Sequence, residues 1–281
     1  MTKNNTHETN YGRILIGAII IVGLVLIIFK SQQRPPPVPS VPLPTNQEKA
    51  RSGSLSLRKQ NDRSIATVGE TFDIVLTANS QKTPIVGYDA VVNFDSSVVS
   101  YKSFKSVDER FEVIGTNQKG QVIITGTSKK EKDSEVMKKT SLVILTFTAE
   151  KLGNGNISLE IDNNPSRRDS NLLDVKGNDV LSKVETGKVM VGKKIVLGTK
   201  EVADGQTKLK ITSVEIPGSG CADCITSVHL QVSKDPNTNR LDFATGGIDG
   251  RPFVSQTAFG VIYESGDVSP SGVVVYYANQ K

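Results

Sequence analysis

The chain has 281 residues, with 34 Lys and Arg against 29 Asp and Glu, and it contains no Trp. An apolar content of 37%, arranged in regularly spaced runs, is enough to build folded cores and excludes disorder along the whole length. Residues 1–50 hold five basic and two acidic side chains, whereas residues 51–281 hold 29 and 27. The folded part is therefore close to neutral and has no basic stripe interleaved with aromatics, which excludes a nucleic-acid binder.

After a tail of residues 1–13, residues 14–30 are predicted to form one transmembrane helix. Residues 14–29 contain no charge and no hydrogen-bonding side chain, and the run approaches the minimum of about 17 residues for a spanning helix. A buried core helix would show a polar face, and a cleaved signal peptide would end in a small-x-small site; neither is present. We expect a single-pass membrane protein whose C-terminal domains are extracytoplasmic, at the cell surface.

Residues 31–53 are predicted to be a proline-rich linker. Six of the twelve prolines lie between Pro35 and Pro44. Because proline fixes its own backbone angle and restricts its predecessor, this stretch should be extended polyproline II, a stalk of roughly 30 Å. A ligand for a proline-binding module would have the same geometry and remains the alternative.

Residues 54–192 are predicted to form the first folded unit. Apolar residues alternate with a period of two, and turns rich in Gly, Asn, Asp and Lys separate the runs, which is typical of an antiparallel β-sandwich. The apolar stripes of three predicted strands are Phe72, Ile74, Leu76 and Ala78; Val86, Tyr88, Ala90, Val92 and Phe94; and Val143, Leu145, Phe147 and Ala149.

The order of segments in this unit resembles a cohesin module. The segments are, in chain order, residues 69–72 (GETF), 85–88 (IVGY), 92–99 (VNFDSSVV), 120–128 (GQVIITGTS), 145–149 (LTFTA) and 184–191 (VETGKVMV). Residues 94–99 match the family's turn of an aromatic residue, Asp and two later aliphatic residues. The small residues Gly126, Thr127 and Ser128 look like the family's ending of the sixth strand.

The resemblance implies a nine-stranded jelly-roll β-sandwich without catalytic activity, which binds a dockerin-like protein partner through one exposed sheet face. Asp89, Val91 and Asn93 alternate outward on the third strand, and Ile123 and Thr125 would be their neighbours on the sixth. The plainer alternative is an ordinary solvated face. Val91 is the most informative of the five, because an apolar residue among outward polar ones suggests a contact core.

Residues 193–281 are predicted to form a small second β domain, which resembles no family that we recognise. Its strand candidates lie at residues 195–197, 208–215, 226–232, 257–263 and 273–277, between turns containing Gly, Asn and Pro. His229 is out of phase with Val228 and Leu230, so we expect it on a polar face with Ser227 and Gln231.

Cys221 and Cys224 are predicted to form a local disulfide in this exported domain. A redox Cys-x-x-Cys motif follows a strand and opens a helix, and this pair instead follows a Gly-rich turn and leads into a strand. A zinc site needs four ligands, and beyond the two Cys and His229 no fourth is apparent, so we expect no metal and no cofactor.

The chain is not expected to be an enzyme. No Ser/His/Asp or Cys/His arrangement, no phosphate-binding Gly loop and no distinctive carboxylate pair can be placed. The alternative function is a carbohydrate-binding module in polysaccharide attachment or breakdown, since the sandwich fold is shared. The absence of Trp counts against it, because sugar rings pack on aromatic faces, although Tyr276 and Tyr277 remain possible platforms.

Overall fold

The computed structural model describes residues 51–61, 63–130, 135–162, 169–198, 200–216, 225–246, 255–269 and 272–280. The regular secondary structure in these ranges is β-strand throughout, which confirms the all-β fold class. No helix among them is long and apolar enough to cross a membrane. The predicted transmembrane helix at residues 14–30, nearly all of the linker at residues 31–53, and Cys221 and Cys224 lie outside the described residues and stay predictions.

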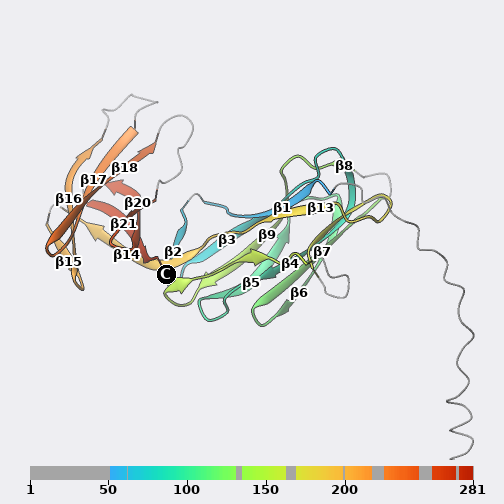
Figure 1. Ribbon diagram of the computed structural model, residues 1–281, viewed down its shortest axis with the longest axis horizontal. Coiled ribbons are helices and arrows are strands. Elements are labelled where there is room, and N and C mark those ends of the chain that lie inside the picture. The colour runs from blue at the N-terminus through green and yellow to red at the C-terminus, as the bar shows by residue number, and fades with distance from the viewer. Residues whose placement is uncertain are drawn as a thin grey trace, which may run out of the picture. The chain divides into compact units, whose positions relative to one another are not determined.

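The first sandwich consists of two sheets that face each other across one core (Figure 1). One sheet has the order β13 (Leu181–Glu185), β1 (Gly53–Lys59), β3 (Thr71–Asn79), β9 (Thr140–Ala149) and β5 (Val99–Ser106). The other has the order β11 (Ser158–Leu159), β4 (Pro84–Asn93), β7 (Gln121–Ser128) and β6 (Phe111–Gln118), and β8 (Glu135–Val136) and β12 (Asn171–Asp174) also pair with β4.

The core of the first sandwich follows the predicted alternation. Every second residue of β3 is buried, as the period of two requires. Phe147 of β9 lies in the middle of the core, with its ring 5.4 to 6.0 Å from the rings of Phe72, Phe94 and Tyr101. The stripe predicted for β4 is wrong at one end: Ile85 is buried and Val86 is only half-buried, because a register shift against β12 at this point changes which side chain faces inward.

The second sandwich contains the remaining strands. One sheet consists of β15 (Val202–Asp204), β16 (Thr207–Glu215), β17 (Ile225–Lys234) and β18 (Asn237–Gly246). The other has the order β10 (Gly153–Asn154), β14 (Met190–Leu197), β21 (Gly272–Asn279), β20 (Val261–Ser269) and β19 (Gln256–Ala258), and β2 (Ile65–Thr67) also pairs with β14. Side chains from both sheets form one buried cluster, including Leu230, Phe243 and Tyr263.

Strand β14 belongs to both sandwiches. Its residues 190–192 pair with β2 in parallel, and its residues 193–197 pair with β21 in antiparallel orientation. The carboxylate of Glu264 on β20 accepts hydrogen bonds from the backbone amides of Ser64 and Ile65, both at 3.1 Å, and from the Ser64 hydroxyl. Glu264 is buried, and its carboxylate links β20 to the start of β2.

Candidate functional site

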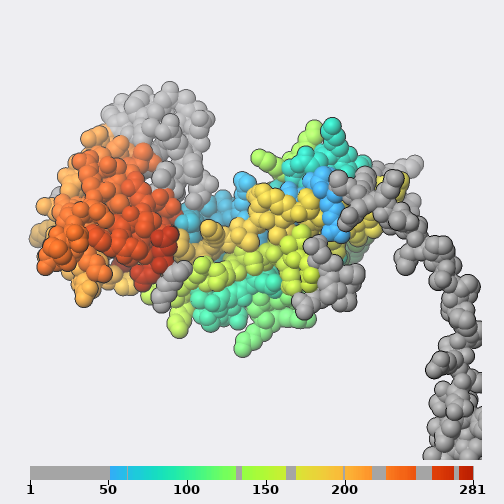
Figure 2. Space-filling model, in the orientation of Figure 1, coloured from blue at the N-terminus to red at the C-terminus, as the bar shows by residue number. Residues whose placement is uncertain are grey.

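The side of β4 and β7 that points away from the core carries all five residues predicted for partner binding. Pairing between the two strands is antiparallel, and it places Asp89 opposite Thr125, Val91 opposite Ile123 and Asn93 opposite Gln121. The five residues are therefore brought together as neighbours on one sheet face, which we call the outer face. The β6–β7 hairpin that continues this sheet is coloured green in Figure 2 and reaches the molecular surface in that view.

Each end of the outer face is a small polar network. At one end, Asp89 accepts hydrogen bonds from the Thr125 hydroxyl at 2.5 Å and from the Asn171 amide at 3.2 Å. This arrangement holds the Asp89 carboxylate in one orientation, with its oxygens satisfied from β7 and β12.

The other polar network contains Asn93, Glu160 and Gln121. Asn93 donates to the Glu160 carboxylate at 3.0 Å and accepts from the Gln121 amide at 2.9 Å. A partner that approaches the outer face therefore meets side chains that are already oriented, which lowers the entropy that binding must overcome.

Val91 and Ile123 do not supply the exposed contact core that the sequence suggested. Val91 retains 1% of its exposure and Ile123 retains 5%, although neither belongs to the core cluster of the sandwich. Both lie on inner strands of the sheet that have partners on both edges. On the far side of β4, the Val91 amide donates to the Ser170 hydroxyl at 3.0 Å, and its carbonyl accepts from the Glu160 amide at 2.8 Å.

The exposed apolar residue of the outer face is Ile114 on β6, which the sequence reasoning missed. It is 63% exposed and lies opposite Thr125 in the β6–β7 pairing. The sequence signal for this strand is the alternation of the apolar residues Phe111 and Val113, just before the predicted turn at residues 117–120. Once that run is assigned to a strand, Ile114 must point outward.

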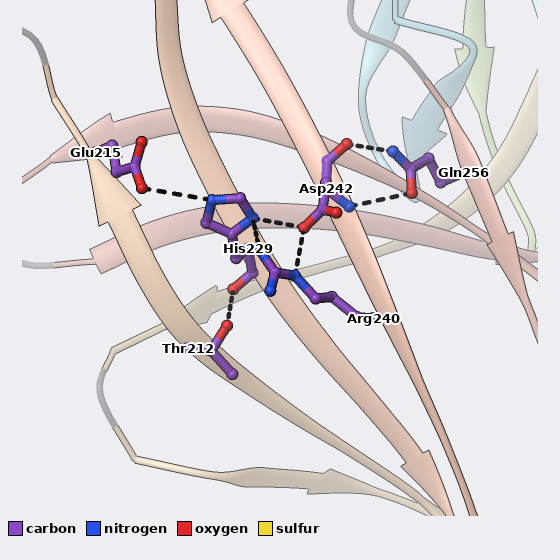
Figure 3. A network of polar contacts seen from close by, with 6 residues as sticks. All are labelled: Thr212, Glu215, His229, Arg240, Asp242 and Gln256. Atoms are coloured by element: carbon purple, nitrogen blue, oxygen red, sulfur yellow. Dashed lines mark hydrogen bonds and ion pairs between the residues drawn. The ribbon is translucent and has the colours of Figure 1, made fainter.

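A second polar cluster lies on the β16–β17–β18 sheet of the second sandwich (Figure 3). His229 Nδ1 is 2.5 Å from Asp242 Oδ1 and 2.8 Å from an Arg240 nitrogen, and its Nε2 is 3.8 Å from Glu215. Val228 and Leu230 on either side are core residues, which confirms the polar face expected for His229. The hydrogen bond with His229, followed by that from Arg240, lowers the pKa of Asp242.

This cluster does not form a hydrolytic triad. The hydroxyl of Thr212 donates to the His229 backbone carbonyl at 3.1 Å. The second ring nitrogen of His229, Nε2, points toward Glu215 and not toward a hydroxyl (Figure 3). A nucleophile would have to lie within hydrogen-bond reach of the imidazole. In the part of the chain that the structure covers, no group of three or more His, Cys, Asp or Glu could hold a metal ion.

One family model matches most of the first sandwich. Residues 61–186 match the family model described as the cohesin domain, which confirms the resemblance seen in the sequence. A search of curated proteins gives no match.

Solved structures similar to this chain include cohesins. A cohesin module of a family 33 glycoside hydrolase from Clostridium perfringens has 15% identity over 50% of this chain and 98% of its own, with a TM-score of 0.42. A cohesin from Clostridium acetobutylicum has 20% identity over 51% and 92%, with a TM-score of 0.41. A type I cohesin–dockerin complex from Clostridium thermocellum has 13% identity over 50% and 92%, with a TM-score of 0.40.

Proposed function

We propose that this protein is a membrane-anchored, surface-exposed and non-catalytic binding module that captures a dockerin-like protein through the outer face of its cohesin-like sandwich. The family match of residues 61–186 supports the class of activity. The observation that carries the proposal is the composition of the outer face: one exposed apolar side chain, Ile114, beside the ordered polar groups of Asp89 and Thr125.

The chemistry of this face suits a flat protein partner. Protein interfaces combine a desolvated apolar contact with a polar rim, and a few central residues carry most of the binding free energy. Ile114 would supply the apolar contact, while the two polar networks would give hydrogen bonds of fixed geometry. Catalysis is not part of this proposal, because the outer face holds no nucleophile activated by a base.

The test is capture of the partner by the full chain in detergent, comparing Ile114→Asp with Val68→Asp. Ile114 and Val68 are both more than half exposed, so neither change should disturb folding. Val68 lies in the turn after β2, away from the outer face. We expect Ile114→Asp to weaken binding at least about tenfold and Val68→Asp to leave it unchanged. Equal binding by the two variants would disprove the assignment of this face.

Calcium provides a second arm of the capture experiment. The dockerins that cohesins bind need calcium to fold, so chelation should release a dockerin-like partner. Capture that persists unchanged after chelation would point to a partner of another kind, while the Ile114 result would still identify the face that binds it.

Membrane anchoring is tested separately. We expect the full chain to sediment with membranes and to resist extraction at high salt, because a spanning helix is released only when the bilayer is dissolved. Deletion of residues 14–30 should move the protein to the soluble fraction. External protease should cleave the intact protein between the helix and the folded part if the C-terminal domains are extracytoplasmic.

A further inference from the structure

The second sandwich contains a pocket that partner capture by the outer face does not use. Its volume is about 360 Å³, within the range of small-molecule sites, which is about 300–1,000 Å³. Strands β14, β15, β16, β20 and β21 line it, and residues 152–154, at the turn that leads into β10, complete the lining. The pocket thus lies beside the strand that the two sandwiches share.

The pocket has an aromatic wall. The rings of Tyr263 and Tyr277 are stacked, with centroids 6.0 Å apart and an angle of 20° between the planes. Tyr263 is buried, whereas Tyr277 is half-buried and lines the opening. Tyrosine combines a flat apolar ring with a polar end, a combination that suits ligands with both apolar and hydroxyl-bearing surfaces.

The charges of the pocket neutralise each other. Lys193 Nζ lies 2.9 and 3.2 Å from the two carboxylate oxygens of Asp204, and the Tyr277 hydroxyl also bonds to that carboxylate. The hydrogen bond from Lys193 is the main cause that lowers the pKa of Asp204, so this carboxylate stays charged at neutral pH. Burial raises the pKa of Tyr277, so its hydroxyl stays protonated. Because Lys193 and Asp204 form an ion pair, these two groups give the pocket no net charge, which suits a neutral ligand.

The rim offers side chains that can both donate and accept. Within the described ranges, the side chains of Thr207 and Asn279 make no hydrogen bond to another residue, and both line the pocket. Asn154 uses its amide oxygen to accept from the Asn156 backbone at 3.2 Å, which leaves its NH₂ group for a ligand. Hydroxyl and carboxamide groups match the mixed donor and acceptor character of sugar hydroxyls.

We propose that this pocket binds one ring of a neutral saccharide, packed against Tyr277 and hydrogen-bonded by Thr207, Asn279 and Asn154. The site is independent of the outer face, so the protein would hold a partner protein and a glycan at the same time. Of the two tyrosines that the sequence left as possible sugar platforms, Tyr277 lines the pocket, with Lys193 Nζ 5.9 Å from its ring centroid, and Tyr276 does not line it. Tyr276 is 7% exposed, and the Arg63 guanidinium covers its ring at 3.9 Å from the centroid.

The test is ligand-observed NMR on the full chain in a detergent without a sugar headgroup. The probes are neutral oligosaccharides of glucose, xylose, mannose and N-acetylglucosamine, with oligogalacturonate as the anionic comparison. We expect saturable binding of at least one neutral probe and weaker or no binding of the anionic one. Absence of saturable binding to every neutral probe, or a preference for oligogalacturonate, would overturn the proposal.

Variants locate the binding. Asn279→Ala combined with Thr207→Val should weaken the bound glycan about tenfold or more, because a site that bonds hydroxyls loses its partners. Asn237→Ala, an exposed change at the first residue of β18, should have no effect. Glycan binding that is unchanged in the double variant would place the sugar elsewhere.

The same variants separate this proposal from partner capture. Ile114→Asp should leave glycan binding intact, and the Asn279 and Thr207 changes should leave capture of the protein partner intact. If the full chain binds only the protein partner, the glycan pocket is disproved and the outer face is not. If it binds only glycan, the assignment of the outer face is disproved and the pocket is not.

Discussion

At the scale of single residues, the fold disfavours the charged form of the Lys59 side chain. Burial, with a smaller contribution from Arg63, lowers its pKa from 10.5 to about 8. The unfolded chain therefore binds more protons than the folded protein between about pH 8 and 10.5, and the free energy of unfolding should rise with pH across that window.

The variant Lys59→Met tests this pH dependence. It keeps the length of the side chain and removes the charge, so it should be more stable than the natural protein at pH 7 and should show a smaller rise between pH 8 and 10.5. Urea denaturation at pH 7, 8 and 10.5 measures both effects, with Lys102→Met on the exposed face of β5 as control. The same slope in both variants would show that Lys59 keeps an ordinary pKa.

The outer face shows how far single residues could be predicted. Alternation along β4 was enough to place Asp89 and Asn93 on one side of the strand, because the direction of a side chain follows from the period of two. The burial of Val91 could not be predicted, since alternation gives the direction of a side chain and not its exposure.

At the scale of elements, glycine positions decide where strands can approach. A Cβ on Gly126 of β7 would lie 2.2 Å from the Tyr88 ring, so glycine at this position makes room for a core tyrosine. A Cβ on Gly192 of β14 would lie 2.2 Å from the Tyr277 carbonyl and 2.8 Å from Ile65. Both sites need glycine for close packing, and neither could be distinguished in the sequence from a turn glycine.

The link between β20 and β2 is a buried carboxylate with two backbone donors. We predict that Glu264→Ala destabilises the protein by about 2–4 kcal/mol, because it leaves the amides of Ser64 and Ile65 without their acceptor. The stability of Glu264→Gln should lie between that of Glu264→Ala and that of the natural protein, since a carboxamide has one acceptor oxygen for two donors. Glu215→Gln, at an exposed carboxylate, is the control, and urea denaturation is the measurement. Equal stability of the Ala and Gln variants would argue against this role.

At the scale of the whole molecule, strands could be predicted in both parts of residues 54–281, but the connection between the parts could not. The period of two in residues 54–192 and 193–281 indicated strands in both. A boundary between residues 192 and 193 nevertheless divides β14, whose first three residues pair with β2 and whose last five pair with β21. Periodicity describes one strand at a time, and a strand that continues from one sheet into another looks the same in sequence as a single strand.

Removal of residues 193–281 should therefore damage the first sandwich at one end and leave the outer face unchanged. The deletion removes Glu264 together with Tyr276 and Ala278, and it exposes Ile65, which forms a small apolar cluster with those two residues. The loss of a few kcal/mol should lower the Tm of the shortened protein by roughly 5–10 °C. Hydrogen exchange should become faster in β2 and in the first residues of β14, whereas β4 and β7 should stay protected because their sheet contains no strand of the second sandwich. Capture of the partner should persist, since Ile114, Asp89 and Thr125 all lie on that sheet, and a shortened protein that folds but no longer captures would show that the second sandwich contributes to the interface.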